Sequence, residues 1–269
     1  MSTAPLTRAV PARLVRSLHG AAAFVDRVGI ALLFPKDDLV LPSLWEAVAG
    51  TGRVEWATRD DEERFIEFSP NFDKVWRWKD ELPEKKLACV GKHVRGRSAL
   101  ISLDALPALY ALTGRKGRAA DFRDQDDLSP LERDVAEFVY QEGPVSTAEV
   151  RRTFSGGGKR SATVTDALEK LLILTKAGHV EQDQGWAAAM VDILPRRYKE
   201  HLRRIPSADG ARAELAACVL AGARELSVAD LTAAMGWRKA DAMAALDGLV
   251  GNRSATVGME DGITIYRPR

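Results

Sequence analysis

Apolar residues recur at helical spacing through the middle of the chain. A first helix is predicted to begin at Ser129-Pro130, since serine caps helices and proline fits the first turn, and to stop before Gly143-Pro144. Ser146, with Glu149 three residues later, has the spacing of a capping box and predicts a second, short helix. After a run of three glycines, the apolar spacing resumes from about Lys159 and predicts a third helix.

Two predicted strands follow this third helix. They run from Ile173 to Thr175 and from Trp186 to Ala189, with a polar turn between them. The same order returns near the C-terminus, where Ser227 is predicted to cap a short helix and Asp261-Gly262 is a favoured hairpin dipeptide. Three helices followed by a hairpin are typical of a winged helix-turn-helix, so the sequence predicts two such units in tandem. The alternative is a pair of small helical bundles that bind no ligand.

The N-terminal part differs in composition, because it holds four of the six tryptophans, at positions 45, 56, 76 and 78. Its spacing predicts short helices mixed with short strands. The predicted fold class is therefore α+β and mostly helical, with an N-terminal Trp-rich mixed domain ahead of tandem winged helix-turn-helix modules. We place the Trp-rich domain at 1–112, a charged linker at 113–127, the first winged helix at 128–204 and the second at 205–269.

Charge separates the two predicted winged units. Six cations lie between Arg151 and Lys176, against only Asp166 and Glu169, whereas five carboxylates outnumber four cations between Ala211 and Gly248. Clustered Lys and Arg bind DNA phosphates, so the first unit is predicted to bind duplex DNA. The second is predicted to be a scaffold, a homodimer surface or a weaker DNA contact. For any single cation, a solvated helix face is the simpler explanation. The predicted DNA contacts are Arg151, Arg152, Lys159, Arg160, Thr163, Lys170, Gln182, Gln184, Arg196 and Arg197.

Composition limits the function classes that remain. The 269 residues, 46% of them hydrophobic, are enough for a globular core and two or three domains. Because the net charge is only +1, binding to nucleic acid would depend on a local patch. The two cysteines and four histidines are scattered, so no disulfide framework, metal site or cofactor is predicted. No apolar run approaches the roughly 18 residues of a membrane span, and we predict a cytoplasmic protein without a membrane partner, associated with the nucleoid if it binds DNA.

The N-terminal part also carries a family resemblance. The stretch from Asp38 to Gly50, which contains Pro-Ser-Leu-Trp-Glu-Ala, together with Phe34-Pro35, residues 76–83 and Gly91-Lys92, resembles the bacterial AlkZ-related winged-helix proteins over about residues 24–198. The resemblance implies a relationship to tandem winged-helix DNA glycosylases that excise alkylated or crosslinked bases. Those enzymes carry a Gln-x-Gln or Gln-x-Asp motif that positions the attacking water, and the Trp-rich domain at 1–112 contains neither.

Candidate residues for such chemistry are few. Glu46, Asp38 and Asp80 are the candidate catalytic carboxylates, because a glycosylase needs a carboxylate or amide to orient water or to stabilise a developing sugar cation. Trp45, beside Glu46, is the candidate for stacking on a base. The simpler alternative makes Trp45 a core residue and Glu46 a surface carboxylate near a helix cap. The string Gln182-Asp183-Gln184 falls in the predicted hairpin turn, where polar residues are expected from solvation and can also contact DNA.

Two functions from different classes remain open. We favour a DNA-binding winged-helix protein that acts in genome maintenance or regulation without catalysis. The alternative is a DNA glycosylase-like enzyme that excises alkylated or crosslinked bases and accepts an extruded base in its Trp-rich domain. A cleft that joins the N-terminal tryptophans to the basic unit, with a carboxylate or glutamine at its base, would favour the enzyme, whereas a packed N-terminal core would count against it.

Overall fold

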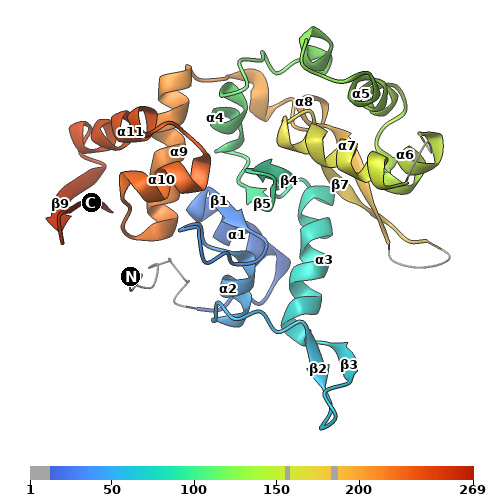
Figure 1. The fold of residues 1–269 in the computed structure, drawn as a ribbon, viewed down its shortest axis with the longest axis horizontal. Coiled ribbons are helices and arrows are strands. Elements are labelled where there is room, and N and C mark those ends of the chain that lie inside the picture. Colours follow the sequence, from blue (N-terminus) through green and yellow to red (C-terminus); the bar gives the residue numbers. More distant parts are fainter. Residues whose placement is uncertain (1–12, 155–157, 183–186) are drawn as a thin grey trace.

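The computed structural model describes residues 13–154, 158–182 and 187–269, with the backbone alone for 158–161. Helix makes up about 47% of the chain, and the strands are short and gathered into small sheets (Figure 1). This confirms a mixed α+β fold in which helices predominate.

Serine caps define the helices of the N-terminal part. Ser43 and Glu46 form the reciprocal hydrogen bonds of a capping box at the start of α2, and Gly50 caps its C-terminal end. Ser69 caps the long α3, whose first residue is Pro70. The N-terminal elements are α1 (Leu18–Val28), β1 (Ile30–Leu32), α2 (Leu44–Ala49), β2 (Ala57–Arg59), β3 (Phe65–Phe68), α3 (Pro70–Glu84), β4 (Cys89–Val94), β5 (Arg97–Ile101) and α4 (Leu106–Ala111).

A three-stranded antiparallel sheet in the order β1-β5-β4 lies at the centre of this part. Successive side chains of a strand point to opposite faces. Ile30 and Leu32 accordingly join one buried cluster, whereas Ala31 and Leu33 join another, which contains the α1, α2 and α3 side chains. Burial on both faces explains why the sequence around β1 is continuously apolar and does not alternate.

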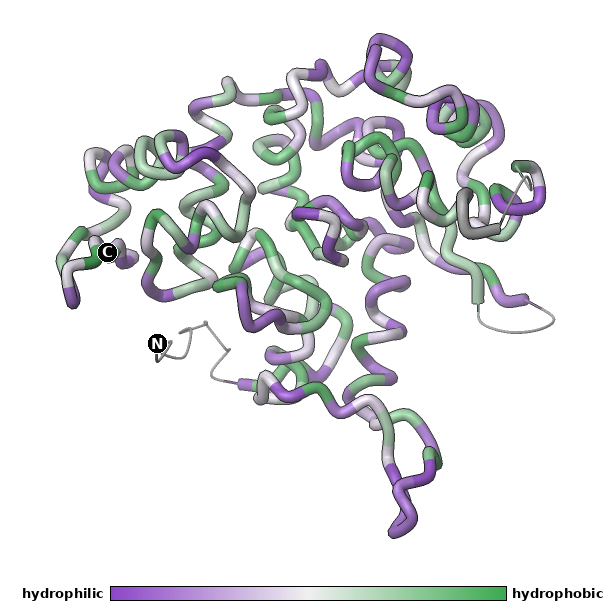
Figure 2. Tube along the Cα trace, in the orientation of Figure 1, coloured by the Kyte–Doolittle hydropathy of each residue, from purple (hydrophilic) through white to green (hydrophobic). Residues whose placement is uncertain are grey.

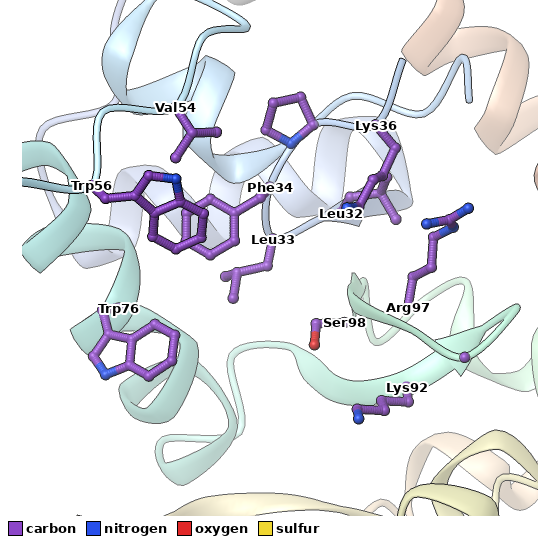
Figure 3. Close-up of a pocket in the computed structure, with 12 residues that line it drawn as sticks. Leu32, Leu33, Phe34, Lys36, Val54, Trp56, Trp76, Lys92, Arg97 and Ser98 are labelled. Atoms are coloured by element: carbon purple, nitrogen blue, oxygen red, sulfur yellow. The ribbon is translucent and has the colours of Figure 1, made fainter. Parts of the chain in front are cut away.

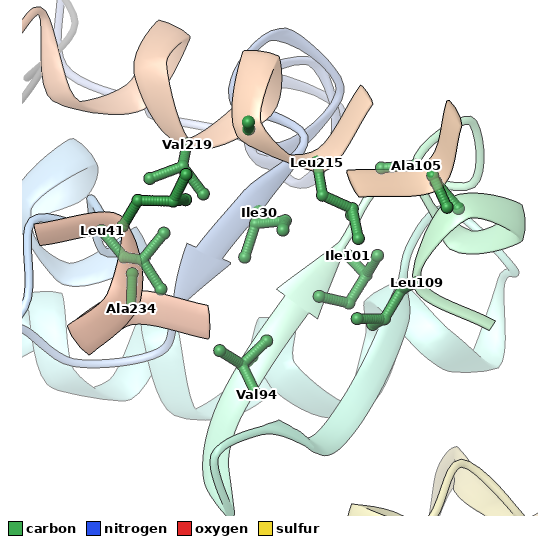
Figure 4. Close-up of a cluster of buried hydrophobic side chains, with 14 of the residues drawn as sticks. Ile30, Leu41, Val94, Ile101, Ala105, Leu109, Leu215, Val219 and Ala234 are labelled. Atoms are coloured by element: carbon green, nitrogen blue, oxygen red, sulfur yellow. The ribbon is translucent and has the colours of Figure 1, made fainter. Parts of the chain in front are cut away.

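Helices from the C-terminal end of the chain cover the first of these faces. Ile30 and Ile101 of the sheet share one core with Leu215 and Val219 of α9 and Ala234 of α10 (Figure 4). The predicted domain boundaries stay a prediction. The N-terminal sheet nevertheless packs against α9 and α10 from the C-terminal part of the chain. The C-terminal elements are α9 (Ala208–Ala223), α10 (Val228–Met235), α11 (Lys239–Gly251), β9 (Ala255–Glu260) and β10 (Ile263–Pro268).

Gly29 shows how closely these two parts approach. It ends α1 with a φ of 71°, and a Cβ atom added there would lie 2.4 Å from Sγ of Cys218 on α9. A side chain at this position would therefore meet both backbone strain and a clash.

The middle of the chain shows the predicted order of three helices and a hairpin. Ser129 and Ser146 both form the capping boxes that open their helices, and Gly143 ends the first one. The hairpin strands are longer than predicted, and Trp186, which was expected to begin the second strand, lies outside the described residues. The elements are α5 (Pro130–Glu142), β6 (Val145–Ser146), α6 (Thr147–Thr153), α7 (Gly158–Lys170), β7 (Leu174–Val180), β8 (Ala188–Ile193) and α8 (Leu194–Arg197).

The second predicted hairpin is also present at the C-terminus. Asp261 and Gly262 have φ values of 47° and 78°, the left-handed backbone that a tight hairpin requires, and Ser227 caps α10 as predicted. The charged segment at 113–127 is more ordered than its composition predicts. It contains a short 3-10 helix, η1 (Asp121–Asp124), in which the buried Asp121 carboxylate accepts hydrogen bonds from the backbone nitrogens of Lys116 and Arg118. A last short 3-10 helix, η2 (His201–Arg203), precedes α9.

Candidate nucleic-acid interface

Several of the predicted DNA contacts are exposed. Arg151 and Arg152 are exposed on α6, and Thr163 and Lys170 are exposed on α7. Lys170 ends α7 and packs against the turn between β4 and β5, because a Cβ atom on Gly96 would lie 2.6 Å from its Cε. The basic surface of α7 thus reaches the edge of the N-terminal sheet.

Other predicted contacts lie partly or wholly outside the described residues. Lys159 and Arg160 fall in the first turn of α7, but their side chains are not described. Gln182 follows the end of β7 and is half-buried, whereas Gln184 lies outside the described residues.

Two predicted contacts are engaged within the protein. Arg196 donates hydrogen bonds to the carbonyl oxygens of Val139 (2.9 Å) and Tyr140 (2.7 Å) at the end of α5. Arg197 donates to the carbonyl oxygens of Pro83 and Ala177. These guanidinium groups link α8 to α5, α3 and β7, and their donors are used within the protein.

A cleft of about 620 Å³ lies between the N-terminal tryptophans and the β4–β5 hairpin, and we call it the aromatic-basic cleft (Figure 3). Its floor is the end of β1 and the residues that follow. Its sides come from the segment before β2, from α3, and from β4 and β5. The lining residues are Leu32, Leu33, Phe34, Pro35, Lys36, Val54, Trp56, Trp76, Lys92, Gly96, Arg97 and Ser98.

One side of the cleft is a cluster of aromatic rings. Phe34 lies 5.2 Å from Trp56 and 5.7 Å from Phe72 between ring centroids, and Phe72 stacks on Trp76 at 5.5 Å. Trp56 remains 53% exposed and Trp76 39% exposed, although large aromatic residues are usually well covered. Each therefore offers part of its ring to a ligand.

The opposite side is cationic, and two of its cations form ion pairs. Lys92 on β4 pairs with Asp166 on α7, and Arg97 on β5 pairs at 3.0 Å with Asp38 in the loop between β1 and α2. Figure 3 shows the Lys36, Lys92 and Arg97 side chains across the cleft from the tryptophans. An aromatic face opposite cations suits a nucleobase with its phosphate.

A buried polar seam holds α7 against this side of the cleft. The Glu169 carboxylate, fully buried on α7, accepts a hydrogen bond from the Lys92 backbone nitrogen at 2.9 Å and pairs with Lys176 of β7 at 2.7 Å. Nδ1 of His93 donates to the Glu169 carbonyl oxygen over 2.8 Å. Burial lowers the pKa of His93, and the neighbouring Glu169 carboxylate offsets this shift only in part, so the imidazole is neutral at pH 7.

The candidate residues for catalysis lie elsewhere. Trp45 is 1% exposed and donates through Nε1 to the Arg53 carbonyl oxygen, while Glu46 is used in the capping box of α2. Trp45 is therefore a core residue, as the simpler alternative states, whereas Glu46 belongs to the cap but is buried and does not lie on the surface. Asp38 and Asp80 are each held in an ion pair, Asp38 with Arg97 and Asp80 with Lys79 at 2.6 Å.

The described lining of the cleft contains no Asp, Glu, Asn or Gln. Two features would have marked an enzyme. The cleft lies beside the tryptophans but includes no residue of α7, which is linked to it through the Lys92–Asp166 pair, and its described lining has no carboxylate or amide. Among the described residues, no group of three or more His, Cys, Asp or Glu is placed to hold a metal ion, and no described helix is long and apolar enough to cross a membrane.

Sequence reasoning missed most of the cleft residues. Trp56 and Trp76 were noted only as part of the aromatic content, and Phe34, Lys92 and Arg97 were not singled out as site residues. One signal was available, because Trp56 follows Glu55 and Trp76 precedes Arg77, and both tryptophans stand among charged residues. An aromatic residue in such surroundings is a candidate for an exposed contact.

Comparison with known proteins confirms the family resemblance. The AlkZ-related family matches residues 15–235, most of the chain. The chain belongs to this family. Among solved structures, it is similar to the DNA glycosylase AlkZ of Streptomyces sahachiroi, with a TM-score of 0.52 and 12% identity. At this identity the similarity of the AlkZ-related chain to the glycosylase extends to the fold alone.

The two chains differ in length. The match covers 96% of this AlkZ-related chain but only 66% of the glycosylase. A second structure, the DIP2311 protein from Corynebacterium diphtheriae, is 18% identical over 76% of this chain and 40% of that one, with a TM-score of 0.22 that is too low to relate the folds. The search of curated proteins found no match.

Proposed function

We propose that this AlkZ-related protein binds duplex DNA through α7 and the β7–β8 hairpin and does not excise bases. The element order α5, β6, α6, α7, β7, β8, with the sheet order β6-β8-β7, is that of a winged helix-turn-helix. In such a unit the third helix enters the major groove with its N-terminal residues at the base edges. Lys159 and Arg160 occupy that turn of α7, and Arg151, Arg152 and Lys170 supply exposed cations on α6 and α7.

We further propose that the aromatic-basic cleft accepts one base from outside the DNA stack. The rings of Phe34 and Trp56 provide the stacking surface, and Lys92 and Arg97 lie across from them, where they can contact a flanking phosphate. Stacking on an aromatic side chain contributes about 1–3 kcal/mol per base, which is comparable to the few kcal/mol needed to unstack a damaged or unpaired base. The cleft should therefore favour DNA with an unpaired or weakly paired nucleotide.

The observation that carries the non-catalytic part of the proposal is the chemistry of the cleft lining. Hydrolysis of a glycosidic bond needs a group that orients water or stabilises the developing positive charge of the sugar. The described lining provides apolar side chains, aromatic rings, a serine and cations, of which Lys92 and Arg97 are paired with carboxylates, and it provides no carboxylate or amide that could orient water. A base held in this cleft is thus bound and left intact, which fits a role in recognising DNA damage or in regulating its repair.

The second unit, residues 205–269, has a different charge and is given a different role. Arg238, at the start of α11, pairs with Asp241 at 2.9 Å, so this helix presents little net positive charge to DNA. We propose that residues 205–269 form a scaffold and that the exposed Met259 and Ile263 of its hairpin form a homodimer contact. DNA binding of this kind would place the protein at the nucleoid.

One experiment tests binding and catalysis together. Alkylated and undamaged duplexes are incubated with the protein, abasic sites are measured, and affinity is followed as a function of salt. We expect no release of bases above the background without protein, and a slope of log affinity against log salt of about −3.6 if four phosphates are contacted. Release of alkylated bases with turnover, or an affinity independent of salt, would overturn the proposal.

A matched pair of variants locates the DNA-binding surface. Lys159→Glu with Arg160→Glu reverses two charges in the first turn of α7, and we expect it to weaken binding to all duplexes. Arg238→Glu with Lys239→Glu reverses two charges at the equivalent place on α11 and should leave the affinity within about threefold. Equal losses from the two variants would show that the surface has been assigned to the wrong unit.

A further inference from the structure

The β2–β3 hairpin (residues 57–68), which we call the acidic hairpin, projects from the body of the protein at the end of α3. Figure 1 shows it standing clear of the other elements, and Figure 2 shows a hydrophilic tip, at the bottom of the view, and a more apolar base. It carries Phe65 and Ile66, whose exposed fractions are 54% and 55%. Two adjacent large apolar residues at the end of a projecting hairpin are costly to leave in water and call for an explanation.

The apolar residues of the hairpin continue the aromatic cluster outward. Phe65 contacts Phe68 at 5.3 Å between centroids, and Phe68 contacts Phe72 of α3 at 5.0 Å. A continuous aromatic stripe therefore runs from the wall of the cleft to the exposed end of β3. Since contacts within the protein support this stripe only at its inner end, its outer end is available to a partner.

The turn of the hairpin is held in one conformation by its own side chains. The Asp60 carboxylate accepts hydrogen bonds from the backbone nitrogens of Glu62 (3.0 Å) and Arg64 (2.9 Å) and from Nε of Arg64 (2.8 Å). Arg59 donates to the Glu63 carbonyl oxygen at 2.6 Å. Because the surface is pre-organised, a partner would lose little conformational entropy of the hairpin on binding.

These contacts use both cations of the hairpin, so its remaining charge is negative. Residues 57–68 hold two cations against five carboxylates, and Arg64 is already paired with Asp60 and Glu62. Asp61, Glu63 and Glu67 are exposed and form no ion pair with any described residue. The apolar end of the stripe is thus surrounded by unpaired carboxylates.

This charge decides between the classes of partner. DNA phosphates would be repelled by the carboxylates, although an exposed aromatic hairpin would otherwise resemble a wedge between bases. A second acidic hairpin would be repelled in the same way, which argues against a symmetric pairing of two copies. A protein segment that carries lysine or arginine between apolar residues is complementary in both respects.

The backbone adds a means of attachment. In the described part of the chain, β3 pairs only with β2, so no other described strand covers its outer edge. An extended peptide can add to such an edge as a further strand, with main-chain hydrogen bonds supplying affinity and alternate side chains supplying specificity. We propose that the acidic hairpin is a docking site for an extended, cationic and partly apolar segment of another protein, which pairs with β3 and packs on Phe65 and Ile66.

The test uses a display library of random twelve-residue peptides, selected on the full-length protein and depleted on the double variant Phe65→Ser with Ile66→Ser. Peptides that are retained only by the unchanged protein are then measured by fluorescence anisotropy. We expect them to carry net positive charge and at least one large apolar residue, and to bind more weakly as salt is raised. Their affinity should fall at least about tenfold in the double variant, which corresponds to about 1.4 kcal/mol.

Two further variants test whether the peptides recognise the charge and the position of the acidic hairpin. Asp61→Lys with Glu67→Lys should reduce the affinity for the same peptides, because it reverses unpaired carboxylates and leaves the turn intact. Met243→Ser removes an exposed apolar residue from α11, to which no binding role is assigned, and should have no effect. Since all these side chains are exposed, the variants should melt within a few degrees of the unchanged protein.

The proposal is overturned by any of four results. The selection could yield no peptide that depends on Phe65 and Ile66, or peptides that are acidic. The serine double variant could weaken binding to duplex DNA, which would make the hairpin a DNA wedge. Sedimentation could show self-association that the same variant abolishes, which would make the occupant a second copy.

Discussion

The capping box of α2 predicts a structural role for Glu46, the carboxylate that the sequence alone offered as a catalytic candidate. Its Oε2 accepts hydrogen bonds from the Ser43 backbone nitrogen (2.9 Å) and from the Ser43 hydroxyl (2.7 Å), and the residue is only 6% exposed. Glu46→Ala leaves the buried Ser43 N–H without this acceptor, which costs about 1–3 kcal/mol. For a chain of this size each kcal/mol lowers Tm by about 2–4 °C.

The conservative replacement separates structure from catalysis. Gln can occupy the same place in a capping box, so Glu46→Gln should recover most of the stability lost in Glu46→Ala. Both variants, once folded, should bind duplex DNA as the unchanged protein does. Thermal and urea denaturation measure the first effect and a DNA titration the second. The reasoning is refuted if Glu46→Ala melts like the unchanged protein, or if Glu46→Gln removes a DNA-directed activity while stability is kept.

Three other changes test the fold and its electrostatics. Gly29→Ala should destabilise the protein by about 1–3 kcal/mol in urea denaturation, because the new Cβ would clash with Cys218 in overpacked surroundings; an unchanged midpoint would show that α1 and α9 are not so closely packed. Glu214 is exposed, but partial desolvation, and to a smaller extent the nearby Asp104 carboxylate, raises the pKa of Glu214. The folded protein therefore binds this proton more tightly than the unfolded chain, and stability falls slightly as the pH rises from the unfolded to the folded pKa. Glu214→Gln should therefore stabilise the protein at pH 7 and lose this advantage below about pH 4, and a gain that is equal at both pH values would contradict the assignment. Lys92→Met should weaken DNA binding and also loosen α7, because it removes the ion pair to Asp166 while keeping the backbone hydrogen bond to Glu169; hydrogen exchange of α7 that is unaltered would count against this coupling.

Local signals in the sequence predicted the helix boundaries well, for a physical reason. A serine cap acts on a backbone nitrogen three residues away, so Ser129, Ser146 and Ser227 could be identified without knowledge of the fold. The same signal is present at Ser43 and Glu46. The three-residue spacing of Ser43 and Glu46 thus predicts a place for Glu46 in the helix cap.

The candidate site could not be predicted in the same way, because it depends on packing between distant segments. The aromatic-basic cleft takes Phe34 from the end of β1, Trp76 from α3 and Arg97 from β5, and the burial of both sheet faces requires helices from the far end of the chain. Arg196 and Arg197 are the opposite case, residues that the sequence assigned to the DNA-binding surface. Their charge predicted a DNA contact, whereas the structure uses both to satisfy carbonyl oxygens at element ends.

The central claim is that the cleft binds an unpaired base through its exposed rings, and the affinity ratio between a duplex with a single bulged nucleotide and the fully paired duplex tests it most directly. We predict that the unchanged protein prefers the bulged duplex by about tenfold, and that Trp56→Ala loses this preference while still binding the paired duplex, since stacking contributes about 1–3 kcal/mol. Trp56 is half exposed, so the variant should remain folded. Equal affinity of the unchanged protein for the two duplexes, or a preference that persists in Trp56→Ala, would contradict the account.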